Sequence, residues 1–89
     1  MFRQPSVKGM RMTITRLGEK VRLLRQRVGV SQAHLAQHLG LSQRSRGYIS
    51  EIERGTKIPP PDKIVLLARY FHVTTDMLLL DELDIDEDE

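Results

Sequence analysis

Residues 31–55 constrain the fold of this 89-residue chain most, because they place two short helical patterns on either side of a glycine. Ser31 can cap the start of the first pattern, and Gly40 suits its end, where helices commonly close with a positive φ. Each pattern has a narrow apolar face at helical spacing, and the second is otherwise polar or charged. The apolar positions are Leu35, Ala36 and Leu39 in the first pattern and Ile49 and Ile52 in the second. Two amphipathic helices joined by a turn are therefore predicted.

The charge pattern indicates what the polar face of the second helix could bind. The predicted helices cover Gln32–Leu39 and at least Arg46–Arg54, with Gly55 ending the second. Residues 1–57 hold twelve Lys or Arg and three Glu, a net charge of +9, whereas residues 58–89 carry −7. The basic part can attract a polyanion, and the acidic end would repel one. A helix-turn-helix whose second helix enters the major groove of DNA fits both observations.

Three further helices are predicted from apolar residues at steps of three and four. The first follows Thr13 or Thr15 as a cap and ends at Gly29. The second covers Asp62–Tyr70, after a connector stiffened by consecutive prolines. The third is short and is capped by Thr74. Their apolar faces are Leu17, Val21, Leu24 and Val28 in the first, Ile64, Leu67, Ala68 and Phe71 in the second, and Met77 and Leu78, with Leu79 left open, in the third.

The predicted architecture is an all-α, compact five-helix domain at 13–80, between a flexible basic arm at 1–12 and an acidic tail at 81–89. The tail is expected to be too acidic to pack tightly, apart from Leu83 and Ile85. The chain has no cysteine, which excludes disulfides and thiolate metal sites. No apolar run is long enough to cross a bilayer. A cytoplasmic, nucleoid-associated protein without a membrane partner is therefore expected.

Two residues of the predicted helix that ends at Gly29 do not belong to its apolar pattern. Gly18 is expected only to weaken the first turn. Lys20 is placed on the helix surface with the other basic residues. Neither residue is given a functional role.

The chain resembles the lambda-repressor-like, Xre-type (Cro/C1-type) helix-turn-helix domain of bacterial and phage regulators over residues 17–79. The resemblance implies a five-helix domain that binds operator DNA, usually as a two-fold dimer. The matching segments are V-R-L-L-R at 21–25, S-Q-A-H-L-A-Q-H-L-G at 31–40, Y-I-S-E-I-E-R-G at 48–55, Pro59, and L-L-A-R-Y-F-H-V-T-T-D-M-L-L at 66–79.

Counted along the chain, the second predicted helix is Gln32–Leu39 and the third covers at least Arg46–Arg54. The resemblance breaks in the turn between them. Family members typically place one apolar residue between the closing glycine and the serine that opens the third helix, but four residues separate Gly40 from Ser45 here. Either the turn bulges and Ser45 is the cap, or Ser42 caps a helix longer by one turn, about 5 Å. The longer helix is favoured, because polar residues suited to a first turn follow Ser42. Gly47 would then lie inside the helix, at a cost of about 1 kcal/mol relative to Ala.

Base reading is assigned to the third helix and the turn before it. Arg46 is the first choice, because a guanidinium can bond guanine O6 and N7 together, although phosphate contact alone is the alternative. Family members often carry a reading side chain at the position of Gly47. Since Gly47 has no side chain, either the backbone approaches DNA closely there or Gln43 and Arg44 take over the reading. The base-reading candidates are Gln43, Arg44, Arg46, Gly47, Ser50 and Glu51.

Phosphate contacts and a structural pair complete the candidate site. The resemblance implies that Gln32 holds a phosphate and that Arg25 and Glu53 form a salt bridge between the first helix and the end of the third. This pair would orient the third helix rather than touch bases. Basic residues of the arm either follow the DNA into a minor groove or are disordered and have no role. The phosphate candidates are Gln32, Tyr48, Arg54, Thr56 and Lys57, and the arm residues are Arg3, Lys8 and Arg11.

The predicted function is a sequence-specific DNA-binding transcriptional regulator, a repressor that binds a palindromic operator as a homodimer. His34 and His38 have a spacing that can bind zinc but lack a third ligand, so no metal, cofactor or enzymatic activity is predicted. One alternative is an antitoxin or other interaction module whose acidic C-terminal segment docks a basic protein. Another is a nucleoid-type binder without sequence preference.

Overall fold

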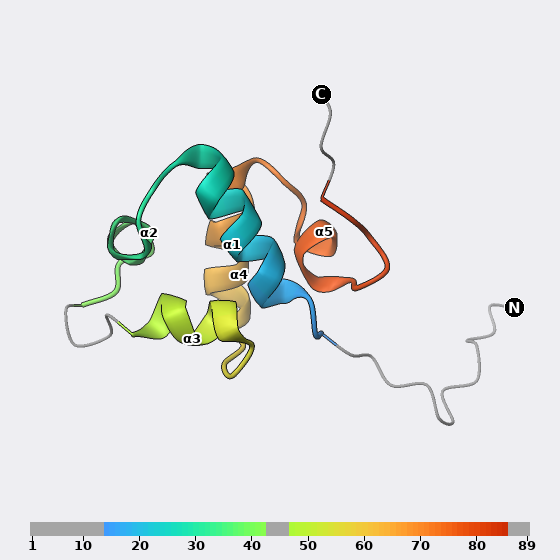
Figure 1. Cartoon of the computed structure of the whole chain (residues 1–89), viewed down its shortest axis with the longest axis horizontal. Coiled ribbons are helices and arrows are strands. Elements are labelled where there is room, and N and C mark those ends of the chain that lie inside the picture. Colours follow the sequence, from blue (N-terminus) through green and yellow to red (C-terminus); the bar gives the residue numbers. More distant parts are fainter. Residues whose placement is uncertain (1–13, 43–46, 86–89) are drawn as a thin grey trace, which may run out of the picture.

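The computed structural model describes residues 14–42 and 47–85, which form five helices around one apolar core. In Figure 1, α1 and α4 occupy the centre, α2 and α3 lie on one side of them and α5 on the other. The helices are α1 Leu17–Val28, α2 Gln32–His38, α3 Tyr48–Arg54, α4 Pro61–Phe71 and α5 Thr75–Leu79. No strand occurs among the described residues, so the all-α prediction is confirmed. None of the described helices is both long and apolar enough to cross a membrane.

Local sequence explains where α2, α4 and α5 begin. Ser31 Oγ accepts a hydrogen bond from the His34 backbone N–H at 2.9 Å, and Thr74 Oγ1 accepts one from the Met77 N–H at 3.0 Å. Both predicted N-caps are thereby confirmed. Helix α4 begins one residue earlier than predicted, at Pro61, because the fixed φ of proline suits the first helical position.

The apolar faces predicted for the helices form the core, with one exception. Leu17, Val21 and Leu24 of α1 are buried, but Val28 is 54% exposed, so this predicted face is too long by one turn. The predicted positions on α2, α3 and α4 are all buried. On α5, Leu78 is fully buried, and Met77 and Leu79 pack on the edge of the core.

Lys20 is buried in the core, with 1% of its surface exposed, so its predicted surface position is wrong. Its Nζ donates to the backbone oxygens of Met77 and Leu80, each at 2.7 Å, and of Leu83 at 2.5 Å. Burial lowers the pKa of the Lys20 ammonium, and the nearby Arg16 charge adds to this effect. The side chain thus satisfies carbonyl groups at the end of α5 and beyond it.

Lys20→Met is expected to lower the free energy of unfolding by about 1–3 kcal/mol, because it keeps an apolar stem but leaves buried acceptors without a donor. Urea denaturation measures the change. Lys63→Met is the control, since Lys63 Nζ reaches a single carbonyl, that of Leu39, at 3.2 Å from a side chain that is 25% exposed. A Lys20→Met protein no less stable than Lys63→Met would contradict the assigned role.

The chain beyond α5 returns to the start of α1 (Figure 1). Residues 81–85, expected as part of a loose tail, pack against the domain here. Ile85 is 5% exposed, as predicted, whereas Leu83 is 37% exposed. Thr15 is not the cap of α1, because its backbone N–H and its hydroxyl both donate to Asp81, and Arg16 takes the N-cap position. The alternative cap, Thr13, lies outside the described residues.

Candidate nucleic-acid interface

Helix α3, the predicted reading helix, begins at Tyr48. Gly47 precedes it as an exposed N-cap with φ −83° and ψ −1°, so the prediction that α3 reaches back to Arg46 with Gly47 inside is wrong. Glycine is a poor residue for a helix interior, which favours a helix that starts after it. The base-reading candidates Gln43, Arg44 and Arg46, and the alternative cap Ser45, lie outside the described residues.

The inner face of α3 is held directly against α1. Ile49 and Ile52 are 0% and 1% exposed. On the α1 side, a Cβ added to Gly18 would lie 2.2 Å from the Ile52 carbonyl oxygen and 2.7 Å from that of Glu53. The two helix backbones therefore touch, and only glycine fits at the contact. Gly18 is a packing residue here, not merely a weak point in the first turn of α1.

A single carboxylate ties α1, α2 and α3 together. Arg25 Nε lies 2.6 Å from Glu53 Oε2, and Arg25 Nη2 donates to Glu53 Oε1 at 3.1 Å. The expected pair is thus present, and it is shielded, because the two side chains are only 14% and 5% exposed. The hydrogen bond with Glu53 raises the pKa of the Arg25 guanidinium, although burial opposes the shift.

Gln32 joins this pair, which the sequence did not indicate. Its Nε2 donates to Glu53 Oε1 at 3.0 Å, so the amide predicted to face a phosphate is turned toward the end of α3. Arg25 Nη1 also donates to the Val30 carbonyl oxygen, at 3.0 Å, just before α2. We call Arg25, Gln32 and Glu53 the three-helix cluster. It fixes the end of α3 relative to both α1 and α2.

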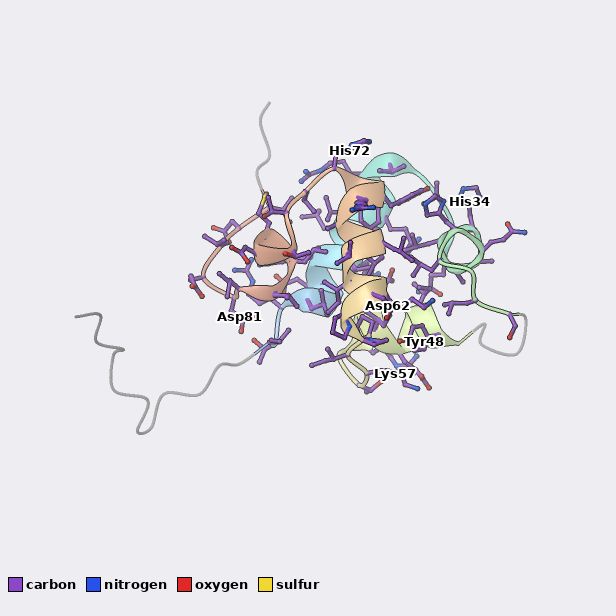
Figure 2. The ribbon with its side chains drawn as sticks, turned by 180° about the vertical axis from the view of Figure 1, so that it is seen from behind. His34, Tyr48, Lys57, Asp62, His72 and Asp81 are labelled. Carbon is purple, nitrogen blue, oxygen red and sulfur yellow. The ribbon has the colours of Figure 1, made fainter. Side chains whose placement is uncertain are left out.

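The outer face of α3 carries predicted base-reading residues that are paired with predicted phosphate contacts. Arg54 Nη1 donates to Ser50 Oγ at 2.7 Å, and Lys57 Nζ lies 3.3 Å from Glu51 Oε1. Lys57 Nζ also lies 5.3 Å from the centroid of the Tyr48 ring, and Figure 2 shows both residues at the same edge of the molecule. The described part of this face is therefore a row of polar side chains paired with one another.

Thr56 stands at the end of the same face. Its hydroxyl donates to the Glu51 carbonyl oxygen at 3.1 Å, and its backbone N–H bonds the same oxygen at 3.0 Å. Gly55, with φ 83°, closes the helix before it. These contacts leave Thr56 exposed beside Arg54 and Lys57.

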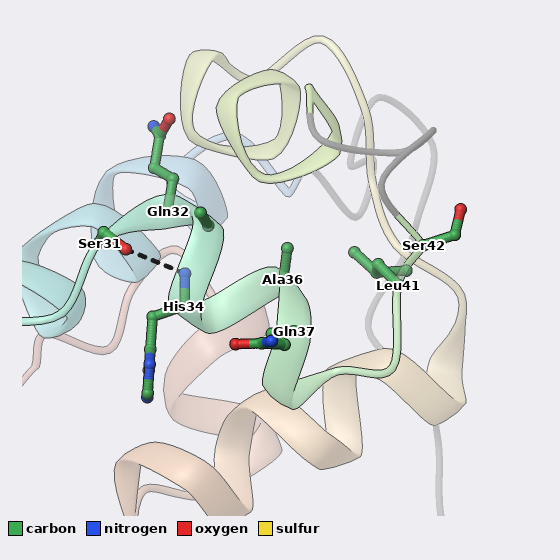
Figure 3. A pocket seen from close by; sticks show the side chains of 8 residues that line it. Ser31, Gln32, His34, Ala36, Gln37, Leu41 and Ser42 are labelled. Carbon is green, nitrogen blue, oxygen red and sulfur yellow. Dashed lines mark hydrogen bonds between the residues drawn. The ribbon is translucent and has the colours of Figure 1, made fainter.

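An open hollow of about 780 Å³ lies along α2, with Leu41 and Ser42 at its far end (Figure 3). The Ser31–His34 capping bond lies at its other end. It is lined by Ser31, Gln32, Ala33, His34, Ala36, Gln37, Leu41 and Ser42. The open shape offers little enclosure for a small-molecule cofactor.

The two histidines considered as zinc ligands, His34 and His38, have other surroundings in the structure. The His38 ring packs on the Tyr70 ring with 4.3 Å between centroids, and His34 lines the open hollow. Within residues 14–42 and 47–85, no group of three His, Cys, Asp or Glu side chains could hold a metal ion.

Comparisons with known proteins support a helix-turn-helix fold. The helix-turn-helix domain family matches residues 16–80. No curated protein matches the chain. A crystal structure of the P22 c2 repressor protein in complex with a synthetic operator is 28% identical with a TM-score of 0.64, and the match covers 71% of this chain and 91% of that one.

Two further solved structures are similar over most of their length. The restriction-modification controller protein C.AhdI from Aeromonas hydrophila is 30% identical with a TM-score of 0.63, covering 74% of this chain and 96% of that one. A hypothetical transcription factor, NHTF from Neisseria, is 29% identical with a TM-score of 0.64, covering 90% and 85%. The chain therefore belongs to the helix-turn-helix family of DNA-binding transcriptional regulators, with the five-helix lambda-repressor-like fold, and not to a family of enzymes.

Proposed function

We propose that this chain is a sequence-specific transcriptional repressor that binds a palindromic operator as a homodimer, with α3 in the major groove. The observation that carries the proposal is how α3 is held. Its inner side rests on the backbone of α1 at Gly18, and its end is fixed by the three-helix cluster. Its outer face carries Ser50, Glu51 and Arg54, which are paired with one another or with Lys57. A firmly held helix with a polar outer face is what base reading requires.

The pairs on the outer face suggest how binding would proceed. Glu51 can accept a hydrogen bond from cytosine N4 once Lys57 leaves it for a phosphate, and Ser50 can be released when Arg54 does the same. Gln32 would reach a phosphate only by giving up its bond to Glu53. Tyr48 and Thr56 would contact the sugar-phosphate backbone of the DNA from the two ends of α3. Base reading by Gln43, Arg44 and Arg46 completes the proposed site.

The P22 c2 repressor supports the DNA assignment, because that protein was solved with a synthetic operator. Two copies of this chain would place their α3 helices in successive major grooves, about 34 Å apart, on a palindromic site. Such a regulator would act in the cytoplasm, on the nucleoid. Sedimentation of the protein with and without a selected operator tests the dimer.

Arg46→Ala is expected to lower affinity for the selected operator by about 5- to 150-fold, the worth of a bidentate contact to guanine, and to lower non-specific affinity much less. Selection from a random DNA pool supplies the operator, and fluorescence anisotropy at several salt concentrations measures both affinities. Arg69→Ala, which removes the same charge from the exposed surface of α4, is the control. Equal losses on both DNAs would make Arg46 a phosphate contact, and wild-type binding without sequence preference would contradict the repressor.

The interaction-module alternative has less support. It requires the apolar residues at this end of the chain, Leu79, Leu80, Leu83 and Ile85, to be free for a basic partner. Ile85 is buried in the core, Leu79 and Leu80 are only partly exposed, and Leu83 is exposed.

A further inference from the structure

The segment that follows α5 binds the residues that lead into α1. The N-cap residue of α1, Arg16, makes no side-chain capping bond of its own. Instead, Asp81 Oδ1 accepts the Arg16 backbone N–H at 3.0 Å and the Thr15 N–H at 3.1 Å. Asp81 Oδ2 accepts the Thr15 hydroxyl at 2.6 Å. A carboxylate from 65 residues away is thus held at the start of α1, where the helix dipole favours negative charge.

Residues 80–85, which we call the clasp, are held on α1 by further contacts. Arg16 Nη1 donates to the Asp81 carbonyl oxygen at 2.6 Å and lies 2.9 Å from Asp84 Oδ1. Lys20 Nζ bonds the carbonyl oxygens of Leu80 and Leu83. Ile85 anchors the end of the clasp in the core. Figure 2 shows Asp81 beside the start of α1.

The turn of α1 that the clasp holds is also the one that touches α3. Gly18 lies two residues after Arg16, and its backbone meets the carbonyl groups of Ile52 and Glu53. No side chain lies between the two backbones to absorb a shift. A displacement of the first turn of α1 must therefore move the end of α3.

We propose that Asp81 is a positioning residue for α3. By fixing the start of α1, it sets, through Gly18, where the end of the reading helix lies. Release of the clasp therefore weakens DNA binding without touching the DNA face. The effect on DNA rests on the proposed function, whereas the effect on α3 does not.

Asp81→Ala in the full chain tests this role, with Thr74→Ala as a matched control. Thr74 also accepts a backbone N–H at a helix start, but its bond stays within α5. We expect Asp81→Ala to shift the backbone amide NMR signals of Ile52 and Glu53 as well as those of Thr15 and Arg16. Operator affinity should fall roughly 2- to 30-fold, the range over which distant residues modulate a coupled site. Thr74→Ala should leave both readouts unchanged at a temperature where each variant is fully folded.

Asp81→Asn makes the test independent of whether Asp81→Ala folds. Its one remaining carbonyl oxygen can still accept the two backbone N–H groups, so it should fold, but the lost charge should still shift the Ile52 and Glu53 signals more than Thr74→Ala does. Amide shifts that stop within α1, or equal shifts in α3 for Asp81→Ala and Thr74→Ala, would overturn the proposal. A wild-type protein that binds no DNA would overturn the proposed function alone, because the amide signals still report on α3.

Discussion

Gly18→Ala is expected to destabilise the domain by about 3 kcal/mol or more, at or beyond the usual cost of overpacking. The new Cβ would lie 2.2 Å from the Ile52 carbonyl oxygen and 2.7 Å from that of Glu53. Both are backbone atoms, which cannot rotate out of the way as a side chain can. Helices α1 and α3 would have to separate and open the core between them. An ordinary Gly→Ala change within a helix has the opposite sign, a gain of about 1 kcal/mol.

Thermal and urea denaturation measure this loss, and Gly47→Ala is the control. Nothing lies within 4 Å of a Cβ at Gly47, and its φ of −83° suits any residue. Its stability should therefore stay close to that of the wild type. A domain of this length loses about 4–8 °C of melting temperature per kcal/mol, so Gly18→Ala should melt at least about 12 °C lower. An unchanged or higher melting temperature would show that the backbone contact is looser than 2.2 Å implies.

The helices could be predicted from sequence because their signals are local. A period of 3.6 residues and a capping serine or threonine each depend on neighbours a few positions away. Lys20 illustrates the limit of such signals. The period that buries Leu17, Val21 and Leu24 also points Lys20 inward, but its charge favoured the surface. Only the fold brings the carbonyl groups that satisfy it, from residues 57–63 positions away.

The candidate site likewise has parts that local sequence signals predict and parts that they do not. The pairing of Arg25 with Glu53 was predicted only from the family resemblance, because 28 residues separate them. The third member of the three-helix cluster, Gln32, was placed on a phosphate because its position at the start of α2 carries no sign of Glu53. Gly18 gave no signal either, since a close backbone contact depends on how two helices cross. Which side chains lie on the outer face of α3 was the easiest part of the site to predict, because their exposure follows from the helical period.

Arg25→Ala is the second change with a large expected effect, a loss of about 3–5 kcal/mol of stability. The Glu53 side chain is only 5% exposed and would lose both guanidinium donors, and within the described part of the chain the Gln32 amide would remain bonded to it. An uncompensated charge would then lie among three helices. Urea denaturation measures the change. Lys57→Ala, which breaks the exposed pair with Glu51 on the same helix, should cost about 1 kcal/mol or less.

A double variant separates the charge from the packing. Arg25→Met with Glu53→Leu removes both charges and fills similar volume, and such replacements of buried pairs are often neutral or stabilising. Its stability should therefore return close to that of the wild type, although the two side chains no longer bond. A double variant as unstable as Arg25→Ala would show that the hydrogen bonds, rather than the stranded carboxylate, account for the loss. Recovered stability with weakened operator binding would instead mean that the three-helix cluster serves chiefly to orient α3.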